Sequence, residues 1–326
     1  MELLVLSHSE VERLLAAEEC IELMEEALRD HAAGRIWQPL RFVVSPARTE
    51  SLLGLMPAFR SAPRPAYGLK AVAIFPGNPA RGLDLHQGGV LLFDGETGEL
   101  RALIEASAVT AIRTAAVSAV ATRALARAEA RVLAVLGSGV QARAHLQALA
   151  QVRSFELARV WSRNGEHARA LAEATAAPFR VEVAASARAA LEGADVVVTA
   201  TSSREPILER GWLAAGAHVN AVGASIAAAR ELDAATVAEA ALFVDSRESV
   251  VNEAGDYLFA VTELGLGPDH IRAELGEVLS GSREGRRSPE ELTVFKSVGL
   301  AAEDLAVAEY LDRLARETGV GTLVPV

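Results

Sequence analysis

The chain has 326 residues, a formal net charge of −11 and 51% hydrophobic residues. Its length and hydrophobic content predict a globular protein of two domains rather than a disordered chain. The acidic balance argues against nucleic acid or a membrane as a main partner. Cys20 is the only cysteine, so no intrachain disulfide can form, and the first residues lack the basic start of a signal peptide. We therefore expect a cytoplasmic protein.

The first third of the chain predicts a helical start followed by β structure. Ser7 and Glu10 have the spacing of a capping box, and a helical pattern follows through about Asp30, with Gly34 ending it. Residues 40–105 contain short apolar runs bounded by Pro, Gly and Asn, which predict a mixed or antiparallel β region. The segment "DGETGE", residues 94–99, predicts a hairpin turn within it.

The remainder of the chain predicts alternating helices and strands. A helical pattern from Ser107 is followed by strand-like runs at residues 131–137, 156–162, 179–185, 194–201, 217–224 and 241–246. Near-continuous apolar strands separated by helices indicate a parallel sheet covered on both faces. The longest uncharged run, residues 211–229, contains polar residues and glycines and predicts a buried strand with its loops rather than a membrane span.

These patterns give an α/β fold class. We expect a Rossmann-type doubly wound sheet in a nucleotide-binding domain, residues 121–302. An α+β substrate domain would comprise residues 1–120 with 303–326, because the amphipathic final helix can pack back on it.

Gly137, Gly139 and Ala142 match the pattern G-x-G-x-x-A directly between a predicted strand and a predicted helix. The first glycine permits a tight turn, the second lets a pyrophosphate approach the backbone, and the alanine allows close helix–strand packing. The alternative is a strand–helix turn without a ligand. The predicted phosphate-binding residues are Gly137, Ser138, Gly139, Val140 and Gln141.

The end of the next strand favours NADP(H) over NAD(H). An NAD site usually has Asp or Glu there, whereas this chain has Ser162, Arg163 and Asn164. Arg163 can pair with a 2′-phosphate; alternatively it stacks on adenine and both cofactors bind. Small residues at later strand ends complete the predicted cofactor site: Thr199, Ala200, Thr201, Val222, Gly223 and Gly299.

Three cations interrupt apolar segments of the β region and its following helix: Arg41, Lys70 and Arg113. Each could be a snorkelling side chain or half of a salt bridge. Together they predict a pocket for an anionic substrate such as a carboxylate. The chain has only two lysines, Lys70 and Lys296, so each is a candidate for a role that Arg cannot fill. No histidine pair has metal-ligand spacing, so no metal site is predicted.

The segments "LHQGGVLLFDGETGELRALIEASAVTAIRTAAVSAVATRALAR", "LGSGVQARAHLQAL", "VNAVGAS…RELD", "ELGEVLSG" and "TVFKSVGLAAEDLAVA" together resemble the ornithine cyclodeaminase/mu-crystallin family. The resemblance covers nearly the whole chain. It implies a homodimer, a substrate domain that also dimerises, and chemistry at the imine or amine carbon of an amino or imino acid. It also implies that Arg41, Lys70 and Arg113 are the substrate-carboxylate and catalytic cations.

The sequence departs from the cyclodeaminase branch at three places. Gly54 replaces a Glu before "LMP", Ser225 replaces an Asp, and Ser162–Arg163 replaces the acidic residue of an NAD site. The two missing carboxylates are the groups expected to move protons during cyclisation and ammonia loss. The chain is closer to the mu-crystallin and ketimine reductase branch, although the usual "SRPDWRELD" is here "SIAAARELD".

The leading prediction is an NADPH-dependent reductase of α-imino acids, such as pyrroline- or piperideine-2-carboxylate. Arg41 and Arg113 would bind the carboxylate, Lys70 would bind substrate and donate a proton, and Ser225 would orient the imine. The alternatives are an alanine dehydrogenase-type enzyme, an ornithine cyclodeaminase and a non-catalytic NADPH-dependent ligand-binding protein.

Overall fold

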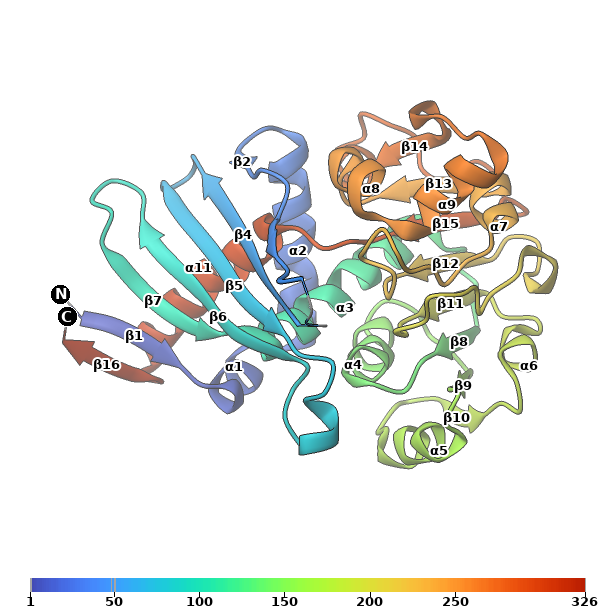
Figure 1. Cartoon of the computed structure of the whole chain (residues 1–326), viewed down its shortest axis with the longest axis horizontal. Helices are drawn as coiled ribbons and strands as arrows, with labels where there is room; N and C mark the ends of the chain where they lie inside the picture. Colours follow the sequence, from blue (N-terminus) through green and yellow to red (C-terminus); the bar gives the residue numbers. More distant parts are fainter. Residues whose placement is uncertain (1, 48, 50, 326) are drawn as a thin grey trace. The chain divides into compact units, whose positions relative to one another are not determined.

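The computed structural model describes residues 2–47, 49 and 51–325 and divides into two compact units (Figure 1). Unit 1 comprises residues 1–113 and 300–326, and unit 2 comprises residues 114–299. The first division falls within helix α3, Ala106–Leu125, and the second falls just before helix α11, Ala301–Thr318. The predicted divisions at residues 120 and 303 lie inside these same two helices.

Unit 1 is built on a mixed eight-stranded sheet, as predicted for the β region. The strand order is β16-β1-β7-β6-β5-β4-β2, and β3 also pairs with β4. The β1–β7 pair is parallel and the other pairs are antiparallel. The strands are β1 Glu2–Leu6, β2 Ile36–Trp37, β3 Phe42–Val44, β4 Leu52–Arg60, β5 Ala66–Ile74, β6 His86–Asp94, β7 Leu100–Glu105 and β16 Thr322–Pro325.

Helices cover one face of this sheet. The structure has two helices, α1 His8–Leu14 and α2 Ala17–Ala32, where the sequence predicted one. The capping box is confirmed, since Glu10 Oε2 accepts hydrogen bonds from the backbone N (2.8 Å) and Oγ (2.7 Å) of Ser7. The break between the helices directs Leu15 into the core. A single 3₁₀ turn, Pro79–Arg81, precedes β6.

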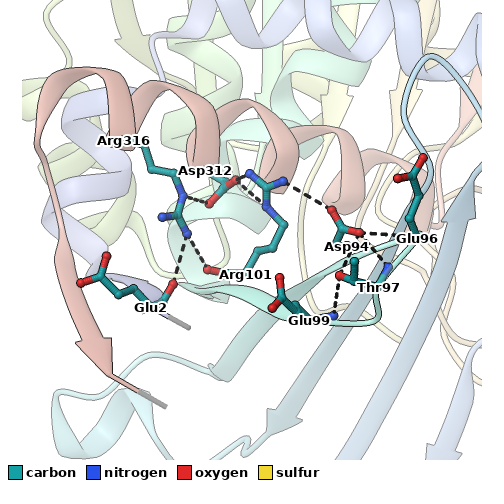
Figure 2. Close-up of polar contacts among 8 residues, drawn as sticks. All are labelled: Glu2, Asp94, Glu96, Thr97, Glu99, Arg101, Asp312 and Arg316. Atoms are coloured by element: carbon teal, nitrogen blue, oxygen red, sulfur yellow. Dashed lines mark hydrogen bonds and ion pairs between the residues drawn. The ribbon is translucent and has the colours of Figure 1, made fainter.

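The final helix α11 packs across β4, β5, β6 and β7 and against α2, so it lies on the sheet of unit 1 (Figure 1). Its C-terminal half is tied to the sheet by ion pairs (Figure 2). Asp312 accepts hydrogen bonds from Arg101 Nη2 (2.6 Å) and Arg316 Nε (2.8 Å), and Arg316 Nη2 donates to the carbonyl of Arg101 (3.0 Å). Asp312 is buried, so these contacts fix where the helix lies on the sheet.

Unit 2 contains an eight-stranded, entirely parallel sheet with the order β10-β9-β8-β11-β12-β15-β13-β14. The chain order reverses on either side of β8, which is the point where doubly wound sheets bind ligands. The strands are β8 Val132–Leu136, β9 Leu157–Trp161, β10 Arg180–Val183, β11 Val196–Thr199, β12 His218–Ala221, β13 Ala241–Val244, β14 Ile271–Glu274 and β15 Thr293–Lys296.

Helices lie on both faces of the parallel sheet, with α4 on one side and α6 on the other (Figure 1). They are α4 Val140–Leu149, α5 Gly165–Ala174, α6 Ala187–Leu191, α7 Ala234–Glu239, α8 Arg247–Glu253, α9 Gly255–Leu264 and α10 Leu275–Leu279, with 3₁₀ turns at Arg210–Trp212 and Pro268–His270. Helix α3 is long and apolar enough to cross a membrane, but 72% of its apolar window is buried inside the structure, as in a core helix.

Two buried histidines of unit 2 are held in their neutral form. His218 Nδ1 lies 2.9 Å from Thr293 Oγ1, and His218 Nε2 lies 3.3 Å from Asn220 Oδ1. Asn220 Oδ1 can only accept, so Nε2 of the neutral ring carries the proton and Nδ1 accepts from the Thr293 hydroxyl, whose lone pair accepts from Arg286 Nη2. Burial lowers the pKa of His218 to about 3 and the pKa of His145 to about 4.

We expect the free energy of unfolding to fall as the pH is lowered from about 6.5 towards 4. The unfolded chain binds a proton at each histidine over this range, whereas the folded chain does not. Each histidine contributes a slope of roughly 1.4 kcal/mol per pH unit. Urea unfolding of wild type and His218→Asn at several pH values measures this slope. A variant whose stability depends on pH as steeply as that of the wild type would contradict the assignment.

Candidate active site

Lys70 and Arg113 are brought together in unit 1 by a carboxylate from α11. Lys70 Nζ lies 2.6 Å from Asp304 Oδ2, and Arg113 Nε lies 3.1 Å from Asp304 Oδ1. Arg113 Nη1 also lies 2.6 Å from Glu303 Oε2. The side chains of all four residues are at most 5% exposed. The two predicted cations therefore belong to a buried cluster of four charged side chains: Lys70, Arg113, Glu303 and Asp304.

Strand parity explains how Lys70 reaches this cluster. On β5 the buried positions alternate as Ala66, Gly68, Lys70 and Val72, and α11 packs against this strand. Lys70 therefore points from the sheet towards the first turn of α11, where Asp304 lies.

The cluster gives Lys70 the chemistry of a proton donor. Burial, followed by the charge of Arg113, lowers the pKa of Lys70 to about 8, and Asp304 opposes this shift. An ammonium group with a pKa near neutral pH can both hold and release a proton under working conditions. Arg113 remains a permanent cation. Lys70 can therefore exchange a proton, whereas Arg113 supplies only charge. This agrees with the expectation that a lysine in this lysine-poor chain fills a role that arginine cannot.

The charges of Lys70 and Arg113 also act on His86. The pKa of His86 is lowered first by burial and then by Lys70 and Arg113, so this side chain is neutral at pH 7. His86, Glu303 and Asp304 were not predicted as individual site residues, although all three stand in the segments that carry the resemblance. Neither a spacing nor a local motif distinguished them.

Arg41 precedes β3 and its side chain is partly exposed. In the sheet register Phe42 pairs with Leu55, and Met56 pairs with Lys70. Continuing the register by one residue places Arg41 level with Lys70, two strand spacings away, or about 10 Å. Arg41 is therefore aligned with the cluster but separated from it by β4.

In unit 2, the turn after β8 has the geometry of a phosphate cradle. Gly137 has φ +132°, and a Cβ there would lie 2.4 Å from the carbonyl oxygen of Ala200. A Cβ on Gly139 would meet no atom within 4 Å, so space is open beside the backbone. Gly139 is the N-cap of α4, and among the described residues no side chain caps this helix. The turn fits the phosphates of a dinucleotide.

The first residues of α4 are Val140 and Gln141, and Val140 is 62% exposed although it is apolar. Across from them, Ser138 Oγ donates to Ser162 Oγ at 2.9 Å, which links the cradle to the end of β9. Asn164 Oδ1 accepts the backbone N–H of Glu166 and caps α5, so its carbonyl oxygen is already used.

Arg163 is exposed beside these residues, at the end of β9. It is therefore an exposed cation next to Ser162, which is hydrogen-bonded to the phosphate turn.

The later strand ends are joined to one another by hydrogen bonds. Thr199 is fully buried, and its carbonyl accepts from the N–H groups of Val222 (3.0 Å) and Gly223 (3.2 Å). Gly299 has φ +82°, and its N–H donates to Asp245 Oδ2 at 2.8 Å. The carbonyl of Thr199 and the N–H of Gly299 are therefore hydrogen-bonded within the protein. They hold the strand ends in place rather than pointing towards a ligand.

Ser225 lies in the partly exposed turn that follows β12, and its N–H donates to the carbonyl of Gly223 at 3.2 Å. Its side chain comes from unit 2, whereas Lys70 and Arg113 belong to unit 1.

The sequence profile of the ornithine cyclodeaminase/mu-crystallin family matches residues 1–319. The chain belongs to this family. The resemblance stated from the sequence motifs is thus confirmed, and so is the Rossmann-type fold class.

Three relatives illustrate the range of the family. The ketimine reductase mu-crystallin of Mus musculus is 42% identical over 278 residues, which is 85% of each chain. The structure of Thermococcus litoralis Δ1-pyrroline-2-carboxylate reductase in complex with NADH and L-proline has a TM-score of 0.95 and 38% identity, covering 99% of this chain and 100% of that one. An archaeal alanine dehydrogenase dimer with bound NAD has a TM-score of 0.93 and 33% identity, covering 100% and 99%.

Proposed function

We propose that the protein is a nicotinamide-dependent reductase of α-imino acids that acts on cyclic ketimines such as pyrroline-2-carboxylate. The observation that carries the proposal is the buried Lys70–Asp304–Arg113 cluster, which places a titratable ammonium beside a permanent guanidinium. The relatives named as a ketimine reductase and a pyrroline-2-carboxylate reductase support the same reaction class.

Arg113 and Lys70 can have different roles in the reduction of an imino acid. Arg113, whose Nε and Nη1 are paired with Asp304 and Glu303, and Arg41 supply the positive charge that attracts the substrate carboxylate. The imine nitrogen gains a proton as the carbon–nitrogen double bond is reduced, and Lys70 Nζ holds that proton. When bound, the reduced nicotinamide supplies the hydride that the imine carbon accepts.

Ornithine cyclodeamination fits this chain poorly. Gly54 is buried on β4, and it points to the same face of the sheet as its neighbour Met56, which pairs with Lys70. A Glu at position 54 would bring a carboxylate to that face, and an Asp at position 225 would add a second carboxylate, in unit 2. Both are absent from the sequence. The groups that would move protons in cyclisation are therefore missing.

The proposal is tested with purified protein, NADPH or NADH, and a panel of cyclic and linear imino acids. Loss of the reduced-nicotinamide absorbance with pyrroline-2-carboxylate or piperideine-2-carboxylate is the expected result. Ornithine turnover together with no reaction across the panel would overturn the proposal.

One rival activity has a specific observation in its favour, because an alanine dehydrogenase is 33% identical to this chain. Pyruvate with ammonia and reduced cofactor separates the two activities. We expect the specificity constant for the cyclic imine to be higher.

A non-catalytic NADPH-dependent ligand-binding protein would instead bind the imino acid tightly and turn none over. Calorimetry on the wild type distinguishes that outcome from catalysis.

Asp304→Asn tests the role of Lys70 through its pKa. Asp304 raises the pKa of Lys70 against the effect of burial, so its loss lowers that pKa further. The protonated donor is then lost at lower pH. We expect the alkaline limb of the kcat/KM profile to move down by about one pH unit.

The matched control for this test is Asp312→Asn, a second buried carboxylate on α11 that pairs with Arg101 and Arg316 (Figure 2). This variant is expected to lower stability and leave the alkaline limb in place. Equal shifts in both variants would show that the effect on Lys70 is not specific.

We also propose that the protein forms a homodimer through the outer face of the unit 1 sheet. The face opposite α11 carries a run of at least partly exposed apolar side chains: Leu53, Leu55, Phe59, Tyr67, Leu69, Leu91, Phe93 and Leu103. A contiguous apolar face on this scale is typical of a protein–protein interface. The alanine dehydrogenase relative is described as a dimer.

Light scattering after size exclusion measures the mass in solution. Wild type is expected at twice the chain mass, and Leu69→Glu is expected at the monomer mass, because a charge at the centre of the face is costly to bury. The control is Val183→Glu at the exposed edge strand β10, which should remain dimeric. A monomeric wild type would overturn the proposal.

A further inference from the structure

Glu231 connects the ends of two neighbouring strands of the parallel sheet. Its side chain is fully buried. Oε1 accepts hydrogen bonds from the backbone N (2.6 Å) and Oγ1 (2.7 Å) of Thr201, just beyond β11. Oε2 accepts from the backbone N of Gly223 (2.7 Å), just beyond β12. One carboxylate therefore holds both strand ends at a fixed spacing.

The Glu231 carboxylate and the two strand ends are closely packed against one another. A Cβ on Gly223 would lie 2.5 Å from Glu231 Oε1 and 2.3 Å from the carbonyl oxygen of Thr201. Gly137 of the phosphate turn similarly approaches the carbonyl of Ala200, at 2.4 Å from its own ideal Cβ. The segment Ala200–Thr201 is thus confined between the phosphate turn and Glu231.

The second lysine of the chain supports this arrangement. Asp256 Oδ1 accepts from the backbone N of Glu231 (2.7 Å) and of Leu232 (2.9 Å), and Lys296 Nζ lies 2.9 Å from Asp256 Oδ2. Asp256 and Lys296 are each about 2% exposed. Burial and Asp256 raise the pKa of Glu231, and Lys296 opposes that shift. Three donors directed at the Glu231 carboxylate match its ionised form.

The sheet order indicates what this carboxylate positions. The phosphate turn follows β8, and the end of β9 on one side carries Arg163 for the adenosine half of a dinucleotide. The strands on the other side of the reversal point are β11 and β12, so their ends face the other half of the ligand. We propose that Glu231, held by Asp256 and Lys296, is a positioning residue that sets the strand ends against which the nicotinamide half of the cofactor lies. This inference rests on the nicotinamide cofactor of the proposed function and not on its imine substrate.

The test compares the intact cofactor with a fragment that lacks nicotinamide. In Glu231→Gln the amide has one acceptor oxygen, so its nitrogen must face a donor N–H at Thr201 or Gly223. We expect the Kd of the reduced cofactor to rise about tenfold, because strand ends that have moved apart no longer fit the nicotinamide half. The Kd of ADP-ribose should stay within about twofold of wild type. Fluorescence titration and calorimetry measure the two.

The matched control is Asp233→Asn, two residues away. Asp233 caps α7 by accepting from Thr236 N (2.9 Å) and also accepts from Arg210 N (3.2 Å). This variant is expected to lower the melting temperature without changing the ratio of the two affinities. If Glu231→Gln fails to fold, Glu231→Asp keeps the charge on a shorter side chain that cannot reach both strand ends, and the same change in ratio is expected.

Wild-type affinity for the reduced cofactor in the folded variant would overturn the inference. So would an equal loss of affinity for ADP-ribose, which would make Glu231 a purely structural residue. A wild type that binds the cofactor but reduces no imine would refute the proposed function alone, because the affinity ratio needs no turnover.

Discussion

Replacing Lys70 with arginine is expected to reduce kcat for imine reduction by about 10²–10⁴-fold, the usual contribution of a positioned general acid. Arginine keeps a positive charge beside Asp304, so the carboxylate of α11 remains paired. The guanidinium, however, does not release its proton at working pH. We therefore expect KM for the imino acid to change by only a few-fold while turnover is lost. Steady-state kinetics with saturating cofactor separates the two constants.

Lys70→Ala completes this test, since it removes both the charge and the proton. It should lose turnover with cofactor affinity intact, and small primary amines added to the assay should restore part of the rate. Circular dichroism must confirm that the variant is folded, because Asp304 loses a buried partner. A Lys70→Arg enzyme with kcat within tenfold or so of wild type would show that Lys70 supplies charge and not a proton.

The second large effect is expected at Arg163. Arg163→Glu should lower kcat/KM for NADPH by about 100-fold, because it replaces a charge-assisted hydrogen bond to a 2′-phosphate with repulsion. The value for NADH, which has no such phosphate, should change little or improve. Kinetics with both cofactors give the ratio.

Arg180→Glu is the matched control for this change, since Arg180 is exposed on β10 of the same sheet and pairs with Glu182. It alters the net charge equally and should leave the cofactor ratio unchanged. If Arg163→Glu weakens NADPH and NADH to the same extent, Arg163 stacks on the adenine instead. A wild type that prefers NADH would refute the proposed preference for NADPH.

Much of the fold could be predicted because its signals are local. The capping box at Ser7, the hairpin turn at residues 94–99 and the alternation of apolar strands with helices are all confirmed. Five strands were missed, and each has five residues or fewer: β1, β2, β14, β15 and β16. Of these, β1 and β16 pair only with one another and with β7. Pairing between the two ends of a chain leaves no local pattern.

The candidate site likewise contains residues that a local sequence pattern indicates and residues that only the folded chain brings together. Lys70 and Arg113 stand out in the sequence because they interrupt apolar segments. Asp304 does not, since acidic residues are common in the first turn of an amphipathic helix. Its pairing with Arg113 joins residues 191 positions apart and depends on how α11 lies on the sheet.

Glu231 could not be predicted from the sequence either. It stands in the segment "RELD", residues 230–233, in which no residue pattern indicates a positioning role. Its role follows from three donors that only the folded strand ends bring together. Buried carboxylates that position other groups are therefore the part of this site that sequence alone could not supply.

We infer that this protein transfers a hydride from a reduced nicotinamide to the carbon of an α-imino acid. It is tested most directly with NADPH that carries deuterium at the transferred position, with pyrroline-2-carboxylate as substrate and mass spectrometry of the product. We expect proline with one deuterium at the α-carbon, and loss of this product in Lys70→Arg. Unlabelled proline, or no proline while ornithine is converted with release of ammonia, would contradict it.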